Sequence, residues 1–170
     1  MAKALENMRA LTVIQLHGFC IGGGVVIATA CDFRVAAEGT VFSIPEIDLG
    51  IPLTWGGIPR LVRDIGALKT KELVITCRRF DAAEAARLGL INEVVPAADL
   101  AARVNALAAE LAGKPSVPAL QTKAQVNAVA NALAVTAFAD GDLLIGARND
   151  PESQAAALDY AQRVFLKKTE

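Results

Sequence analysis

Histidine is nearly absent from this sequence, and cysteine is scarce. His17 is the only histidine among 170 residues, and Cys20, Cys31 and Cys77 form no C-x-x-C pair. A metal site needs several such ligands at short spacing, so we expect no bound metal. An odd number of dispersed cysteines favours reduced, buried thiols and a cytoplasmic protein.

The sequence also lacks an excess of charge of one sign. It has 17 basic and 18 acidic side chains, a net charge of −1. Nucleic acids and anionic membrane surfaces attract proteins with a basic face, so we expect neither as a partner.

No stretch of the sequence is apolar for long enough to span a membrane, which takes about 18 residues. The residues after Met1 contain no hydrophobic run typical of a secretory signal. Yet 54% of the residues are hydrophobic, and the mean hydropathy is +0.40. We therefore expect part of the apolar surface to be buried between subunits of a homo-oligomer.

The order of patterns predicts an α/β fold followed by helices alone. Residues 1–96 are expected to form the α/β core and residues 97–170 a helical segment. Apolar runs and turn residues predict the elements of the core: strands at 11–17, 32–37 and 90–95, a turn at 18–24, helices at 25–30 and from about 58, and a long loop at 42–57. Asp81 and Glu84 have the spacing of a helix-capping box, and that helix is expected to stop at Gly89. Three further helices are expected, from Leu100 to a stop at Gly113, at 117–138 and at 151–167.

Three consecutive glycines, Gly22, Gly23 and Gly24, stand where the first predicted strand turns into a helix. The first N–H groups of a helix point outward with a partial positive charge, and glycine lets a ligand approach the backbone closely. The P-loop and dinucleotide-binding patterns are both absent, which disfavours a phosphate ligand. The residues alone leave two alternatives open: stabilisation of an oxyanion, or close packing of the helix on the strand.

Glu46 lies in the loop after the predicted second strand, among the apolar residues Ile44, Pro45 and Ile47. An apolar environment disfavours the ionised carboxylate and raises its pKa toward the range useful for proton transfer. Glu46 is therefore a candidate acid or base, and the alternative is a solvated loop carboxylate. The solvated alternative is favoured more strongly for Asp48.

Several motifs in register between about Val13 and Asn127 resemble the enoyl-CoA hydratase/isomerase (crotonase) superfamily. They are G-x-x-x-G-G-G before a helix, C-D-x-R-x-A, P-E-x-x-L-G and A-x-x-A-x-x-x-G-L-I-x-x-V-V-P. The resemblance implies a crotonase-like spiral of βαβ turns with a helical C-terminal trimerisation segment. It also implies catalysis on acyl-CoA thioesters by a homotrimer or a dimer of trimers, with coenzyme A as part of the substrate and no separate cofactor.

The resemblance assigns roles to particular residues. By position, Gly23 is expected to donate a backbone N–H to the thioester oxygen as it becomes an enolate, and Glu46 to exchange a proton with the acyl chain. Gly22, Gly24, Trp55 and Val26 are expected to line the substrate site. Val26 stands where hydratases of the family have a second glutamate, which favours a double-bond isomerase over a hydratase.

Two other features depart from the family pattern. The chain begins close to Leu11, where the family has roughly a further third of its length before the matching strand, including a second N–H donor. The alternative function is therefore a catalytically silent binding or assembly subunit, or a fragment that needs its N-terminal part. Trp55 replaces a small residue before Gly56 and Gly57, where it either reshapes the acyl pocket or anchors the following helix.

Overall fold

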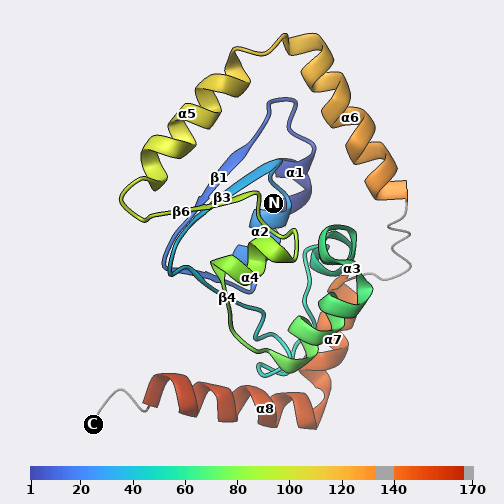
Figure 1. The fold of residues 1–170 in the computed structure, drawn as a ribbon. Helices are drawn as coiled ribbons and strands as arrows, with labels where there is room; N and C mark the ends of the chain where they lie inside the picture. The colour runs from blue at the N-terminus through green and yellow to red at the C-terminus, as the bar shows by residue number, and fades with distance from the viewer. Residues whose placement is uncertain (133–139, 167–170) are drawn as a thin grey trace.

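The structure, a computed structural model, describes residues 1–132 and 140–166, and its strands form two small sheets. One sheet has the strand order β1-β3-β6 and the other β2-β4-β5. The strands are β1 (Val13–Leu16), β2 (Phe19–Ile21), β3 (Phe33–Ala37), β4 (Val41–Ser43), β5 (Phe80–Asp81) and β6 (Glu93–Val95). Figure 1 shows both sheets at the centre of the molecule, with helices around them.

Most of the strand pairs are parallel, as expected for a chain in which strands and helices alternate. β1 pairs with β3, β3 with β6 and β2 with β4 in parallel, whereas β4 and β5 are antiparallel. Strands covered on both faces have continuous apolar runs, and Val35 and Ala36 of β3 are fully buried. The α/β class predicted from the sequence is confirmed.

Four helices accompany the strands: α1 (Ala2–Glu6), α2 (Gly23–Thr29), α3 (Gly57–Thr76) and α4 (Ala82–Arg87). α3 is kinked at Gly66, whose φ of 76° interrupts the helical backbone. The capping prediction for α4 is confirmed, since the Asp81 carboxylate accepts a hydrogen bond from the Glu84 N–H at 2.7 Å. The main core lies between these helices and the strands, and the rings of Phe42 and Phe80 stack inside it.

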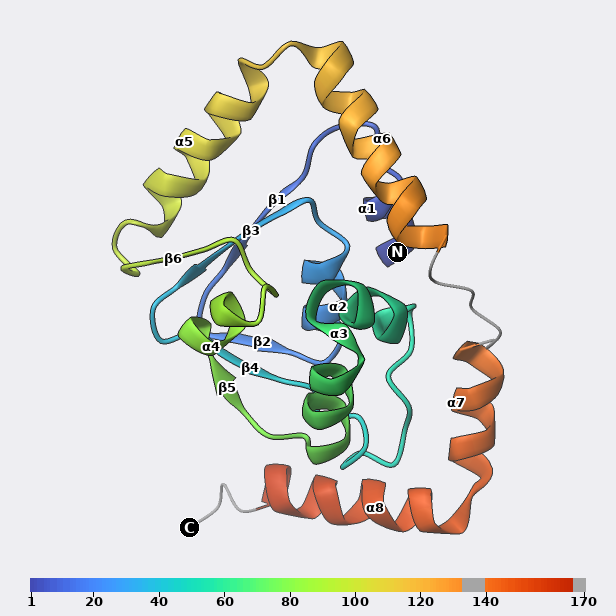
Figure 2. The same cartoon turned by 45° about the vertical axis from the view of Figure 1, so that its right-hand side comes forward.

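The helical segment comprises α5 (Leu100–Ala112), α6 (Ser116–Ala132), α7 (Asp140–Asn149), α8 (Pro151–Ala161) and the short π-helix η1 (Gln162–Leu166). Figure 2 shows α5 and α6 on one side of the core, while α8 runs past the opposite side. The predicted helix 117–138 corresponds to α6, and residues 133–138 lie outside the described residues. Lys167, the predicted end of the last helix, lies outside them as well.

The sequence interpretation missed some elements. β2 falls within residues 18–24, which were expected to form only a turn, and it is a strand because it pairs with β4. α1, β5 and α7 were not predicted either, and β4 includes residues 42 and 43, which were expected to begin a loop. Within residues 1–132 and 140–166, no helix combines the length and the apolar character needed to cross a membrane.

Candidate active site

The parallel pair β2 and β4 brings the glycine run and Glu46 together. Ile21 is in register with Ser43, so the residues that follow these two strands leave the sheet at the same edge. The Gly22 N–H continues the ladder by donating to the Ser43 carbonyl at 2.9 Å. Ligand sites of α/β folds commonly lie beyond the carboxyl ends of parallel strands.

Gly22 occupies a position that no other residue could easily take. Its φ of 52° with ψ of −114° is a backbone conformation that side chains with a Cβ disfavour. A Cβ built on Gly22 would also lie only 2.5 Å from Glu46 Oε1. The missing side chain therefore lets the Glu46 carboxyl group lie directly against the backbone where β2 turns into α2.

Gly23 and Gly24 form the first turn of α2 and are half-buried. The Gly22 carbonyl accepts the first helical hydrogen bonds, from the N–H groups of Val25 and Val26 at 2.9 and 3.2 Å. Among the residues that the structure describes, no acceptor pairs with the Gly23 or Gly24 N–H. These two donors are therefore available at the helix terminus, beside the Glu46 carboxyl group.

Glu46 lies on a tight turn directly after β4. The turn is closed by hydrogen bonds from the Leu49 N–H to the Pro45 carbonyl and from the Ile51 N–H to the Glu46 carbonyl. Oε2 of Glu46 is buried and has no hydrogen-bond partner among the described residues. Burial raises the pKa of the Glu46 carboxyl group, and a hydrogen bond from its own backbone N–H opposes this only partly. A raised pKa of this kind is typical of carboxyl groups that act as an acid and a base.

Trp55 lies against the neighbouring glycine. A Cβ built on Gly23 would be 2.8 Å from Cζ3 of the indole, so the edge of the six-membered ring packs on the Gly23 backbone. Trp55 itself is 58% exposed, and its φ is 60°. A bulky residue in this left-handed conformation is an outlier, which costs about 1–3 kcal/mol and persists only when its surroundings hold it.

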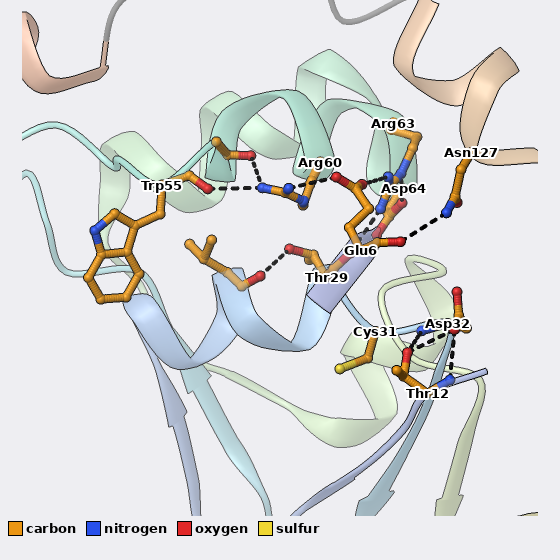
Figure 3. Close-up of polar contacts among 12 residues, drawn as sticks. Glu6, Thr12, Thr29, Cys31, Asp32, Trp55, Arg60, Arg63, Asp64 and Asn127 are labelled. Carbon is orange, nitrogen blue, oxygen red and sulfur yellow. Dashed lines mark hydrogen bonds and ion pairs between the residues drawn. The ribbon is translucent and has the colours of Figure 1, made fainter. Parts of the chain in front are cut away.

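Arg60 holds the Trp55 backbone in place, a role that the sequence did not reveal. Its Nη1 donates to the carbonyls of Trp55 at 2.9 Å and Gly56 at 3.0 Å, and its Nη2 donates to Glu6 at 2.7 Å (Figure 3). Glu6 also accepts a hydrogen bond from Arg63 at 2.8 Å. α1 is thus connected through Arg60 to the loop that carries Trp55.

Val26, which was expected to line the substrate site, has a buried side chain. Its side chain is 1% exposed and belongs to the main core. A Cβ on Gly57 would come within 2.9 Å of Val26, because α2 and the start of α3 pack closely together. The Val26 side chain is therefore used for packing, and it supplies no polar group.

The remaining candidates lie around this centre. Asp48 is exposed, and its carboxyl group interacts with the Cys77 thiol. Burial raises the pKa of Cys20, which lies behind Gly24, to about 12, so its thiol is inert at neutral pH. The Gly50 backbone packs closely on Ser153 of α8, which brings the helical segment against the loop that carries Glu46.

A cavity of about 430 Å³ lies elsewhere, between α6 and the α/β core. Most of its charged lining is internally paired, for example Arg34 to Asp64 at 2.6 Å and Lys123 to Asp32 at 2.7 Å. We interpret it as a structural junction. In the part of the chain that the structure describes, no group of three His, Cys, Asp or Glu side chains is arranged to hold a metal ion.

Comparisons with known proteins agree on one family. The family model described as enoyl-CoA hydratase/isomerase matches residues 1–163. Crotonyl-CoA hydratase of Syntrophomonas wolfei is 32% identical over 98% of this chain. The peroxisomal Delta(3,5)-Delta(2,4)-dienoyl-CoA isomerase of Arabidopsis thaliana is 39% identical over 71% of it. Among solved structures, an enoyl-CoA hydratase from Mycobacterium avium subsp. paratuberculosis matches 95% of the chain with a TM-score of 0.87 and 26% identity.

This chain is shorter than each of these relatives. It spans 65% of the Syntrophomonas protein, 44% of the Arabidopsis protein and 66% of the chain in the Mycobacterium structure. The family match covers both the α/β core and most of the helical segment, and the structural match confirms the expected crotonase-like fold. The chain belongs to the enoyl-CoA hydratase/isomerase family.

Proposed function

We propose that this chain binds an acyl-CoA thioester and moves a proton on its acyl group, with Glu46 as the acid and base. The observation that carries the proposal is the buried, unpartnered Oε2 of Glu46, in a carboxyl group that lies against Gly22. A carboxylate that only stabilised the fold would be expected to have hydrogen-bond partners for its buried atoms.

The proposed reaction needs both the carboxylate and a backbone donor. Ionised Glu46 accepts a proton from the acyl chain, so that a C–H bond breaks and an O–H bond forms. The electron pair moves onto the thioester oxygen, to which the Gly23 N–H donates a hydrogen bond. Glu46 then returns the proton to a different carbon, and the double bond has moved with no net change in composition.

Within this chemistry, we propose an isomerase in preference to a hydratase. Addition of water to an enoyl thioester uses a second group to activate the water, and the position of that group is Val26, which is buried and apolar. One carboxyl group is enough for a proton shuttle. The relatives include both a crotonyl-CoA hydratase and a dienoyl-CoA isomerase, so their names alone do not decide between the two reactions.

The alternative is a catalytically silent binding or assembly subunit, or a chain that acts only with a further polypeptide. It is supported by the share of the relatives that this chain spans, because a second N–H donor and part of the acyl-CoA pocket would come from the remainder. Losing one oxyanion donor lowers a rate by about a hundredfold or more. The proton-transfer test below distinguishes these functions.

We also propose that the chain forms a homo-oligomer, a trimer or a dimer of trimers. Apolar side chains stay exposed along the helical segment, which favours association through these helices: Val117, Val126, Val129, Leu143, Ile145 and Leu158. Coenzyme A enters only as part of the substrate, and no separate cofactor is proposed. All three cysteines are free and buried, which supports a reducing, cytoplasmic location.

The test is incorporation of solvent deuterium into a 3-enoyl-CoA, followed by mass spectrometry. We expect Glu46→Gln to slow incorporation by about 10²- to 10⁴-fold, because the amide cannot accept the proton. Asp48→Asn is the matched control, since it neutralises an exposed carboxyl group of the same loop, and its rate should stay unchanged. Equal rates in Glu46→Gln and the unmodified protein would remove Glu46 from the reaction. Binding without exchange in the unmodified protein would instead favour the silent subunit.

A further inference from the structure

Trp55 combines three features that a simple packing residue would not have. Its indole is 58% exposed, its backbone is in the left-handed region with φ of 60°, and its ring edge contacts the Gly23 backbone. A hydrophobic anchor at the start of α3 would be expected to be buried. An exposed aromatic residue kept in an unfavourable conformation beside a candidate site points to a role in that site.

The contacts that hold the Trp55 backbone in this conformation lie on the side of the residue that faces away from the indole. Arg60 is buried, and its guanidinium group donates both to the Trp55 carbonyl and to the Glu6 carboxylate. Figure 3 shows the indole on the opposite side of Trp55 from these contacts, near the start of α2. The backbone is thus fixed, while the ring keeps one side on Gly23 and exposes the rest to solvent.

The position of the ring has a consequence for any ligand at the site. Glu46 lies against Gly22 and the indole lies against Gly23, so the carboxyl group and the ring flank two consecutive residues. An acyl group whose thioester oxygen accepts from the Gly23 N–H must pass beside the indole. The indole fills the space that a small residue at position 55 would leave open beside Gly23.

We propose that Trp55 is the specificity-determining residue of this site and selects short, planar acyl groups over long or branched ones; the inference rests on the proposed acyl-CoA function. The ring excludes bulk beside Gly23, and its exposed face offers a flat apolar surface to a conjugated enoyl thioester. Selectivity of this kind arises from the volume that the indole occupies. It should therefore change with the size of the residue at position 55.

The decisive experiment compares deuterium exchange with a four-carbon and a ten-carbon enoyl-CoA. We expect Trp55→Ala to raise the ratio of ten-carbon to four-carbon kcat/KM by at least about tenfold, and Trp55→Phe to give an intermediate ratio. Leu68→Ala, which removes an exposed apolar side chain from α3, is the control and should leave the ratio unchanged. A ratio that stays within twofold in both Trp55 variants overturns the inference and leaves the proposed function standing. No exchange by any of the proteins overturns both.

A second measurement uses the unmodified protein, in which Trp55 is the only tryptophan. Saturating crotonyl-CoA should quench or shift its fluorescence, because the conjugated thioester would lie on the indole, whereas free coenzyme A should not. Unchanged emission, with binding established by calorimetry, would contradict the proposal.

The contact with Gly23 can be tested separately from activity. Gly23→Ala alone should lower the unfolding midpoint, since its Cβ would meet the indole at 2.8 Å. In the Trp55→Ala background the same change should leave the midpoint unchanged or raise it, because alanine is favoured over glycine in a helix. The same decrease in both backgrounds would show that the ring does not occupy this space.

Discussion

The two regions of this chain are built from similarly apolar residues but bury them very differently. Residues 1–100 contain all the buried side chains that the structure describes, and from residue 101 onward no described side chain is buried. An apolar composition therefore does not by itself predict a core. A helix buries its apolar face only where another element covers it, and beyond residue 100 the strands cover only part of α5, where Val104 and Leu107 are partly buried.

The contacts between the two regions include long-range hydrogen bonds as well as apolar packing. Lys123 of α6 donates to the Asp32 carboxylate at 2.7 Å and to the Ala10 carbonyl at 2.8 Å. The Asn127 amide donates to the Glu6 carbonyl at 3.3 Å. These bonds are polar, and they join residues that are far apart in the sequence. α5 adds an apolar contact, since Val104 and Leu107 pack against the buried Val35, Ala37 and Val95.

Removing an ion pair is expected to give the largest difference between the two regions in the free energy of unfolding. Glu6→Ala should lower the free energy of unfolding by about 3–5 kcal/mol, because it leaves the buried Arg60 without its carboxylate and removes one of the two carboxylate partners of Arg63, the other being Asp64. Asp159→Ala, which breaks the exposed pair with Arg163 on the helical segment, should change it by less than about 0.5 kcal/mol. Urea unfolding at pH 7 measures both, and equal losses would contradict the comparison.

The ion pairs of Glu6 with Arg60 and Arg63 also predict how stability depends on pH. Burial alone would raise the pKa of Glu6, but the hydrogen bonds and charges of Arg60 and Arg63 outweigh it and lower the pKa below 4.5. A lowered pKa in the folded protein means that the stabilisation is complete above 4.5 and is lost as the pH falls through the folded value. The difference between Glu6→Ala and the unmodified protein should therefore shrink in acid.

A matched pair of leucines tests the apolar side of the comparison. Leu73→Ala removes a side chain that is 0% exposed in the core and should cost about 2–4 kcal/mol. Leu158→Ala removes one that is 67% exposed on α8 and should cost less than about 0.5 kcal/mol. If Leu158→Ala costs as much, and the cost depends on protein concentration, then another subunit covers α8 in solution.

Local chemistry explains what could be predicted from the sequence. The Asp81 cap and the helix stop at Gly113 depend on neighbouring residues, and the structure has both of them. Glu46 and the glycine run were predicted as one site from the motifs, and β2 and β4 bring them together.

Long-range contacts explain what could not be predicted. β2 looked like part of a turn because it is a strand only through its pairing with β4, and the paired residues are 22 positions apart in the sequence. The bond between Glu6 and Arg60 joins residues 54 positions apart, and no local pattern marks it. Val26 was expected at the ligand because of its position in a motif, and its burial where α2 packs on α3 could not be predicted from that motif. Periodicity does not encode which face of a short helix meets a neighbouring helix.

The smallest expected effect concerns the stability of the site itself. Most charged groups of the α/β region are paired, whereas Glu46 keeps an unpartnered buried oxygen and has a pKa raised by burial. A raised pKa means that the folded state binds the proton more tightly than the unfolded state does. Stability therefore falls as the pH rises from 4.5 through the folded pKa, and the loss is complete above it.

Glu46→Gln should therefore be more stable than the unmodified protein at pH 8, by roughly 0.5 kcal/mol, and the difference should vanish near pH 4. Glu110→Gln, which neutralises an exposed carboxyl group on α5, is the matched change in the helical segment and should show no such gain. Thermal unfolding of the three proteins across this pH range measures the difference. A Glu46→Gln protein that is less stable at pH 8 would mean that the ionised carboxylate stabilises the fold, and its buried oxygen would then need a partner in solution. A more stable Glu46→Gln protein would instead show that the ionised carboxylate destabilises the fold. Such a residue is expected to serve the reaction and not the stability of the protein.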